Sequence, residues 1–525
     1  MFRIEVYMIK IILTILLATQ IIYSQVIQRL TADRFTQYKI DDWVSYAPAL
    51  EISSVEIDEN YIYFGTRLGG ILRYNKYTNN WEYPYTTSSG LRSNRIYQVV
   101  YNWDEGFLYA QTSAGIDVYK PAENFWRPST QIHLPPRRGP DQSESESFFQ
   151  SADNSNRFPV FYRPGNNELP DFFTDISLIY HLGGYVLDQY NRQFNFTDRI
   201  VDSWQRLWIG TDGMGPMLAE LDQLQLKSMQ QSIPNISPRD IFIDQDVYWI
   251  GGFRYDNSIG GITRWDRKND EWQYIEASFV PQIYKDDIQA ITGNDRYVLF
   301  ATTLGLTTYD KQKDKWKTYD IKEGLEGNEI LDVIIEKDTA YIATQYGLNW
   351  IDLPSMEIYK SSQDELDNVQ INQLRHDGKL LWAATRYGLY SIDPSKDDIK
   401  FYPSKAVLPD YNPTAIEIVK NQIWIANKYG IAYWDRSSDQ WRSFPDLNFQ
   451  GDIRDIISVG NFMWFATNQG LLRYSFKDNY WRIYDENDGL ISKNVFHLDH
   501  DGSHLWISTD KGITDFRWKR KGRID

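Results

Sequence analysis

The sequence predicts an all-β protein, a β-propeller of about ten four-stranded blades. The first observation behind this is a short motif ending in Thr-x-x-Gly, which recurs along most of the chain. From residue 302 onward its first position falls at 302, 344, 385, 427, 467 and 509, a period of about 42 residues that indicates one supersecondary unit copied many times. The second is a strand-like alternation inside each unit, and the third is an aromatic residue 14 or 15 positions after the motif.

Each unit divides into four short strands. In the segment Trp464–Thr467, Trp464 and Ala466 point to one face, and a large residue beside a small one suits stacked sheets. The motif glycine supplies the positive φ of a tight hairpin turn, and Asp-Gly pairs such as Asp377-Gly378 mark a second hairpin upstream. Leucine-rich and helical repeats have similar periods, but these segments lack helical periodicity and are rich in tyrosine, tryptophan and isoleucine.

The two ends of the chain predict how the propeller closes. The last repeat stops soon after Gly512–Phe516, and Arg523 stands where its outer aromatic residue should be. An extra outer strand, Trp43–Tyr46, precedes the first repeat and matches Trp481–Tyr484 in spacing. We therefore expect the N-terminal strand to complete the last blade, which removes an exposed sheet edge.

The number of rings is less constrained than the blade. Repeats extend over residues 40–525, with an irregular insertion expected at about 128–175, because the interval from Thr112 to Thr211 exceeds two periods. Propellers usually have four to eight blades, which favours two smaller rings. No linker interrupts the chain after Thr211, and on that ground one large ring is the preferred prediction.

Composition limits the partners and the compartment. A net charge of −16 and a pI near 5.0 argue against nucleic acid as a partner. Residues 1–24 resemble a signal peptide, with Lys10 before the apolar run Ile11–Ala18, and a retained N-terminal anchor is the alternative. We expect an exported protein (periplasmic, at the cell surface or secreted) with no membrane span after cleavage. The absence of cysteine excludes a lipid anchor on cysteine and suits a bacterial protein.

No motif predicts catalysis, so no catalytic residue, cofactor or metal site is assigned. Serine-hydrolase, phosphate-loop and zinc-protease motifs are absent from the sequence. The segment His497–His504 is rich in possible metal ligands, but its spacing fits a strand and a hairpin turn better. The segment Asp212–Pro216 carries extra glycine and fits an irregular turn better than a ligand site.

A ligand is expected on the face where the Thr-x-x-Gly turns and the loops between blades meet. Tyrosine beside arginine or lysine suits stacking on sugars and hydrogen bonding to them. The alternative is that these tyrosines pack on the neighbouring blade. The predicted ligand-binding residues occupy the same turn in four consecutive repeats: Gln345, Tyr346, Arg386, Tyr387, Lys428, Tyr429, Asn468 and Gln469.

The insertion has the composition of a mobile segment. Pro135–Pro140 is followed by alternating serine and glutamate at 143–147. Exposed loops on rigid scaffolds often carry recognition, and a solvated segment without function is the alternative.

The repeats resemble the two-component regulator propeller repeat family. Asp488-Gly489-Leu490, Asp501-Gly502, Leu505–Thr509 and Gly512-Ile513 follow the family pattern, and the resemblance extends over roughly residues 50–518 apart from the insertion. It implies an exported bacterial propeller, similar to the glycan-responsive sensors of hybrid histidine kinases and to the propeller part of a type IX secretion surface component. The sequence carries no kinase and no C-terminal β-sandwich, so only recognition is carried over.

Two functions from different classes remain open at this stage. The favoured one is a non-enzymatic recognition or scaffold protein that binds a protein or glycan partner through the loop face. The alternative is a carbohydrate-active lyase or hydrolase, because propellers host such enzymes and the fold alone does not exclude them.

Overall fold

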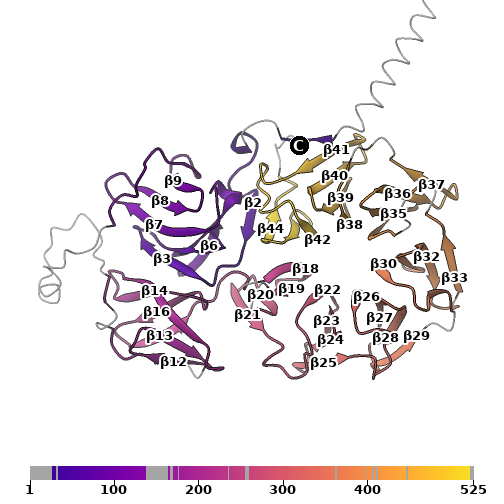
Figure 1. Ribbon diagram of the computed structural model, residues 1–525, viewed down its shortest axis with the longest axis horizontal. Coiled ribbons are helices and arrows are strands. Elements are labelled where there is room, and N and C mark those ends of the chain that lie inside the picture. Colours follow the sequence, from indigo (N-terminus) through magenta and orange to yellow (C-terminus); the bar gives the residue numbers. More distant parts are fainter. Residues whose placement is uncertain are drawn as a thin grey trace, which may run out of the picture.

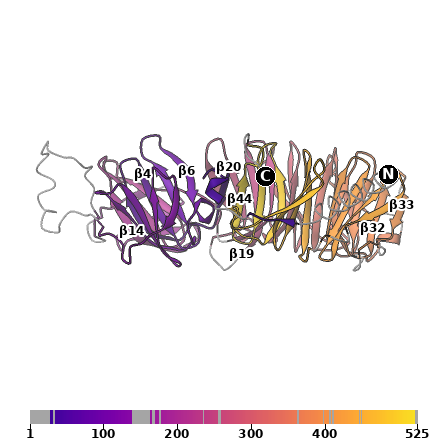
Figure 2. The ribbon, with the colours of Figure 1, turned by 90° about the horizontal axis from the view of Figure 1, so that it is seen from above.

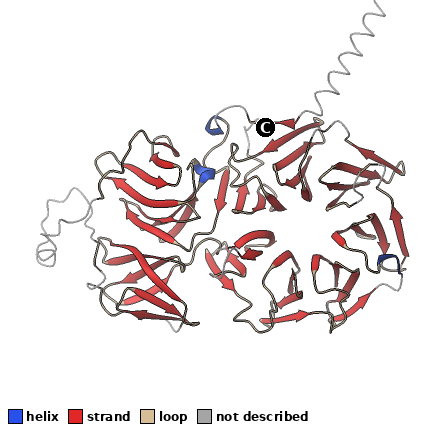
Figure 3. Ribbon diagram, viewed as in Figure 1, coloured by secondary structure: helices blue, strands red, loops and turns tan. Residues whose placement is uncertain are grey.

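A computed structural model shows a protein built almost entirely of β-strands (Figure 3). Among the described residues, the regular structure also includes three single-turn helices, η1 (Arg34–Thr36), η2 (Thr87–Ser89) and η4 (Asp364–Leu366). The structure describes residues 27–30, 34–137, 163–165, 169–174, 177–234, 236–254, 259–360, 364–396, 398–404, 407–408, 412–444, 447 and 449–520. The expected signal peptide lies outside these residues. None of the helices described here has the length and apolar character that crossing a membrane requires.

Seven of the sheets form a ring (Figure 1). Each blade runs from an inner strand at the centre to an outer strand at the rim, in chain order except in the last blade, whose outer strand is β2. The blades are β18 (Ile236–Asp244), β19 (Val247–Arg254), β20 (Ile262–Asp266) and β21 (Glu271–Ile275); β22 (Ile288–Gly293), β23 (Tyr297–Thr302), β24 (Gly305–Asp310) and β25 (Lys315–Tyr319); β26 (Ile330–Glu336), β27 (Thr339–Thr344), β28 (Leu348–Asp352) and β29 (Glu357–Lys360); β30 (Ile371–His376), β31 (Leu381–Thr385), β32 (Gly388–Asp393) and β33 (Asp398–Tyr402); β34 (Ala415–Val419), β35 (Gln422–Asn427), β36 (Gly430–Asp435) and β37 (Gln440–Ser443); β38 (Ile453–Val459), β39 (Phe462–Thr467), β40 (Gly470–Ser475) and β41 (Tyr480–Tyr484); and β42 (Val495–His500), β43 (Leu505–Thr509), β44 (Gly512–Phe516) and β2 (Trp43–Tyr46).

The N-terminal strand closes this ring, as predicted. β2 pairs antiparallel with β44, with Trp43 opposite Phe516 and Tyr46 opposite Ile513. The rings of Trp43 and Phe516 stack with centroids 3.7 Å apart. The closing blade therefore takes three strands from the end of the chain and its outer strand from the beginning.

The other three sheets form an open arc beside the ring, and edge-on the two parts lie side by side in one flat layer (Figures 1 and 2). We call this unit the three-sheet arc. Its middle sheet is the first in the chain, because β3 packs against both β7 and β14. Its strands are β3 (Ile52–Ile57), β4 (Tyr61–Thr66), β5 (Ile71–Asn75) and β6 (Asn80–Tyr85); β7 (Ile96–Asn102), β8 (Phe107–Thr112), β9 (Gly115–Lys120) and β10 (Phe125–Pro128); and β11 (Phe173–Thr174), β12 (Leu178–His181), β13 (Tyr185–Asp188), β14 (Gln193–Val201), β15 (Arg206–Thr211), β16 (Pro216–Glu220) and β17 (Gln225–Ser228).

The prediction of an all-β propeller with about ten blade-like sheets is confirmed, but the preference for one large ring is wrong. The inner strands β18 and β42 pack against each other, so the ring closes after seven blades. The arc is inserted between the closing strand β2 and the first ring blade. The sequence carries no sign of this because residues 229–235, which join β17 to β18, are no longer than an ordinary blade connection.

Alternating residues bind each blade to its two neighbours. In β39, Trp464 and Ala466 belong to the core shared with the last blade, whereas Met463 and Phe465 belong to the core shared with the β34–β37 blade. All four are fully buried. The period-two pattern of the sequence thus places apolar side chains in both interfaces of every strand.

Removal of β2 should open the ring. We expect deletion of residues 26–50 to lower the midpoint of thermal unfolding, broaden the transition and promote self-association, because the edge of β44 becomes exposed. The point variant Trp43→Ala should cost about 3–5 kcal/mol of unfolding free energy, as for other buried aromatic residues. Deletion of residues 26–33 alone, which keeps β2, is the control. Calorimetry and sedimentation velocity test this, and a monomeric deletion protein that melts like the parent would contradict ring closure by β2.

Candidate functional site

The Thr-x-x-Gly turns and the loops between blades meet on one face of the ring, which we call the loop face. The turn joins the second strand of a blade to the third, and in four of the ring blades the residue after the motif threonine bonds to the loop that enters the same blade. The Arg386 amide donates to the Gln370 carbonyl at 3.0 Å, and the Asn468 amide donates to the Asp452 carbonyl at 3.1 Å. The two sets of loops therefore form one continuous surface.

The motif threonine, replaced by Asn427 in one blade, fixes the turn by hydrogen bonds. The Thr385 hydroxyl donates to the Gly388 carbonyl at 2.9 Å and accepts from the Tyr387 amide at 3.2 Å. Thr344 makes the same two bonds to Gly347 and Tyr346. Gly388 has a φ of 139°, a conformation that favours glycine. With the backbone fixed in this way, the side chain of the residue before the glycine is free to point outward.

Four consecutive blades present an exposed apolar or aromatic side chain at that position. The exposed fractions are 46% for Leu304, 48% for Tyr346, 50% for Tyr387 and 53% for Tyr429. We call these four residues the aromatic arc. The tyrosines are therefore not core residues, because about half of each side chain is exposed, whereas core residues are almost completely buried. Leu304 was not among the residues predicted from the sequence, although the repeat places it in register with the tyrosines.

The other predicted residues divide into two groups. Arg386 lies over the ring of Tyr387 at 5.2 Å, and Lys428 lies over the ring of Tyr429 at 4.7 Å. Both cations therefore lie beside the aromatic arc. Asn468 instead braces its own turn, because its amide group bonds to the backbone and side chain of Asp452. Gln345 and Gln469 are half-buried beside the turns.

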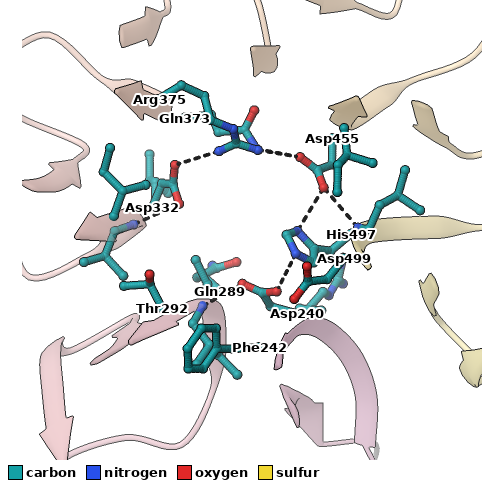
Figure 4. A pocket seen from close by; sticks show the side chains of 18 of the residues that line it. Asp240, Phe242, Gln289, Thr292, Asp332, Gln373, Arg375, Asp455, His497 and Asp499 are labelled. Carbon is teal, nitrogen blue, oxygen red and sulfur yellow. Dashed lines mark hydrogen bonds and ion pairs between the residues drawn. The ribbon is translucent and has the colours of Figure 1, made fainter. Parts of the chain in front are cut away.

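The second candidate is the central channel of the ring, a cavity of about 500 Å³ (Figure 4). Its wall is formed by the inner strands of all seven blades, and the residues labelled in Figure 4 are mostly charged or carry amides. Polar residues at the centre of a closed ring need partners, because leaving them unpaired there costs free energy.

Many of these polar groups bond the backbone of the next blade. Asp240 accepts from the Ile291 amide at 2.6 Å, and Asp332 accepts from the Leu374 amide at 2.7 Å. Gln373 and Asp455 accept from the Ile416 and Leu498 amides in the same way. Asp240, Asp332, Gln373 and Asp455 each follow a bulge in their inner strand, which turns the side chain toward the neighbour.

His497 closes this network between the last blade and its two neighbours. Its Nε2 lies 2.9 Å from Asp240 and its Nδ1 3.0 Å from Asp455 (Figure 4). Burial acts to lower the pKa of His497, but the two carboxylates raise it well above its ordinary value. Likewise, burial would raise the pKa of Asp455, but the charge of His497 and then that of Arg375 lower it to about 2. Both ring nitrogens are engaged, so this imidazole has no free nitrogen to act as a base.

Arg375 spans the channel between further carboxylates. It lies 3.1 Å from Asp455 and 3.3 Å from Glu417. Burial nevertheless raises the pKa of Glu417 to about 7 and that of Asp332 to about 6, despite the opposing charge of Arg375. The channel is therefore a polar network that holds the inner strands together, and its charged groups are occupied by one another.

The histidine-rich segment acts structurally. Asp501 accepts from the Tyr248 hydroxyl at 2.8 Å, and His504 lies 2.7 Å from Asp515. Within the part of the chain that the structure describes, no group of histidine, aspartate and glutamate side chains is arranged to hold a metal ion. The Asp212–Pro216 turn lies in the three-sheet arc, where the Gly215 amide donates to the Leu50 carbonyl.

The described ends of the insertion pair with the inner strands of the arc. Arg137 and Arg163 both contact Glu56 and Asp198, at distances from 2.7 to 3.4 Å. Two guanidinium groups thus neutralise two carboxylates on the inner side of the arc. The serine- and glutamate-rich stretch at 143–147 lies outside the described residues.

Comparison with known proteins supports the fold. No protein-family model and no curated protein matches the chain. Among solved structures, PorZ, a surface component of the type-IX secretion system of Porphyromonas gingivalis, is 12% identical with a TM-score of 0.58, covering 90% of this chain and 87% of PorZ. The extracellular domain of the proposed hybrid two-component system BT4673 from B. thetaiotaomicron is 15% identical with a TM-score of 0.48, covering 90% and 71%.

A lyase is also among the similar structures. Virginiamycin B lyase from Staphylococcus aureus is 14% identical with a TM-score of 0.45, covering 54% of this chain and 94% of the lyase. With a TM-score above 0.5, PorZ shares the fold of this chain. At these identities the likeness extends to the fold alone.

The raised pKa of Glu417 predicts a pH dependence. A carboxyl with a folded pKa of about 7 and an ordinary unfolded pKa of about 4.3 stabilises the fold below pH 4, and this contribution is lost as pH rises through 7. The stability of Glu417→Gln relative to the parent should therefore be greater at pH 8 than at pH 5. Thermal unfolding at both values tests this, with Glu357→Gln on the exposed start of β29 as the control. An equal difference at both values would contradict the ionisation of a buried Glu417.

Proposed function

We propose that this protein is an exported, non-enzymatic recognition or scaffold protein that binds a protein or glycan partner through the loop face of its ring. The observation that carries this is the aromatic arc, in which four successive blades hold exposed Leu304, Tyr346, Tyr387 and Tyr429 at one turn position. Exposed aromatic groups on a rigid scaffold are typical of binding surfaces.

The geometry of the turns supports binding over a structural role for the tyrosines. Each is held at its backbone by a threonine or asparagine brace, so little conformational entropy is lost when a partner binds. Arg386 and Lys428 lie beside two of the rings and supply charged hydrogen-bond donors. A flat aromatic group beside a cation suits sugars and acidic side chains.

The enzyme alternative lacks a supporting observation. The ionisable groups of the channel are engaged with one another and with the backbone of neighbouring blades, and we propose no residue as a catalytic group. Export is proposed on the N-terminal sequence and on the likeness to extracellular and surface domains. A bacterial periplasm, cell surface or culture medium is the expected location.

The double variant Tyr387→Ala/Tyr429→Ala tests whether the aromatic arc binds the partner. Because both side chains are half-exposed, each substitution should change the unfolding free energy by no more than about 0.5 kcal/mol. Binding to a glycan array, or cross-linking to a protein partner in an envelope extract, should fall at least about tenfold, since tyrosine often dominates interface energies. Tyr359→Ala, a half-exposed tyrosine on outer strand β29, is the matched control. A stable double variant that binds as tightly as the parent would contradict a binding role for the aromatic arc.

The class of function is tested on the unaltered protein. A reducing-sugar assay alongside the glycan array separates recognition from turnover. We expect no polysaccharide to be cleaved. Turnover of any polysaccharide would establish the enzyme alternative, and binding to neither glycans nor envelope proteins would contradict the proposed function.

A further inference from the structure

Two blades of this protein already carry an added strand at their outer edge. β1 (Ile27–Gln28) pairs in parallel with outer strand β41, with Ile27 opposite Trp481. β11 pairs in parallel with outer strand β17, with Thr174 opposite Leu226. In both cases an extended segment from elsewhere in the chain joins the first half of an outer strand. The outer edge of a blade in this protein is therefore a surface to which a parallel strand can add.

The corresponding outer strand of the middle sheet in the three-sheet arc is β6, and β2 of the ring lies near it without pairing to it. β6 is an edge strand, and in the described part of the chain no strand pairs with it on the side away from β5. Trp81 of β6 is opposite Tyr74, just as Trp481 of β41 is opposite Tyr474. Trp81 is thus the counterpart of the residue that Ile27 faces, and it is only half-buried.

A cleft of about 460 Å³ runs along this edge, between the arc and the ring. Four consecutive residues of β6, Asn80 to Tyr83, line it. Because neighbouring residues of a strand point to opposite faces, four in a row can line one cleft only if it follows the edge of the strand. Four residues correspond to about 13 Å of extended chain.

The opposite wall combines the first blade of the ring with Tyr46 of the closing blade and suits a peptide. Trp265 and Tyr46 supply buried aromatic surface, and the turn Arg267–Asp270 supplies polar groups. Gln231 lies in the same lining, is 3% exposed, and its Oε1 has no hydrogen-bond partner among the described residues. Charges of both signs are present, with Glu82 and Asp270 against Arg267 and Lys268, so the cleft favours no strongly charged ligand.

We propose that β6 is a docking edge for an extended peptide segment of another protein, which adds as a parallel strand and places a branched aliphatic side chain against Trp81. The pairing of β1 with β41 supplies the template, because Ile27 packs there against the core that contains Trp481. The cleft has a second wall on the ring, so an added strand would be covered on both sides. This site is separate from the loop face and does not depend on it.

Peptide selection tests the proposal on the full-length protein. A phage-displayed library of random heptapeptides is panned against the parent, and the enriched peptides are synthesised with a fluorophore for anisotropy. We expect enrichment of extended sequences with a conserved isoleucine or valine. Copies of these peptides with alternate N-methylated amides should bind at least about tenfold more weakly, because strand addition depends on main-chain hydrogen bonds.

Protein variants locate the binding. Trp81→Ala should weaken binding at least about tenfold, whereas Trp441→Ala, at the same outer-strand position opposite Trp434, should lose similar stability without affecting binding. Gln231→Leu should weaken binding while leaving the melting temperature unchanged or higher, since it removes an unpaired polar atom. If Trp81→Ala fails to fold, the N-methyl comparison on the parent still decides the outcome.

Each other outcome overturns the inference. No enriched peptide, equal binding of the N-methylated peptides, or equal loss with Trp441→Ala would each exclude strand addition at β6. Peptides that lose binding with Tyr387→Ala/Tyr429→Ala instead of Trp81→Ala would support the loop face and reject this cleft. The failure of one site is therefore distinguishable from the failure of the other.

Discussion

The pairing of β2 with β44 is the interaction on which the rest of the structure depends. It joins the beginning of the chain to its end inside one blade, and at its centre the Ser45 hydroxyl bonds to Thr514 and to Ser88 of the arc. The arc is inserted between β2 and the first ring blade, so both of its connections leave from this region. The Ser232 hydroxyl joins the two connections by donating to the Ala47 carbonyl at 2.6 Å. Closing the ring therefore also anchors the arc, and Arg192 on the arc adds a two-bond contact to Glu276 of the ring.

In both parts of the molecule, polar side chains of the inner strands accept hydrogen bonds from backbone amides of a neighbouring blade. In the ring, Asp332 and Asp455 accept backbone amides of the next blade, and in the arc Asp198 and Ser54 accept the Val55 and Val99 amides. What differs is how the remaining charge is neutralised. Across the closed channel His497 and Arg375 meet carboxylates from other blades. In the open arc, where no blades stand opposite, Arg137 and Arg163 from the insertion take that role.

The sequence predicted the structure of a single blade but not how the blades are arranged into a ring and an arc. The four-strand unit, the turn glycines and the closing strand could be predicted because each follows from local alternation and spacing, as Trp464 with Ala466 and Trp43–Tyr46 show. The seven-blade ring could not, since it depends on the packing of β18 against β42, two strands that look like any other pair of repeats. Only part of the aromatic arc could be predicted from the sequence. Tyr387 and Tyr429 stood out beside a cation, whereas Leu304 carried no chemical signal and only its register with the tyrosines could have found it.

The asymmetry of the loop face follows from how the turn is built. Threonine and glycine carry the hydrogen bonds of the turn, so the residue before the glycine is not needed for folding and is free to vary between blades. In four consecutive blades that residue is Leu304, Tyr346, Tyr387 or Tyr429, but in the last two it is Gln469 or Lys511. If these positions served only to fill space between blades, the same apolar residue would be expected all around the ring. Their change from apolar to polar part-way round instead suits a partner that covers one side of the ring.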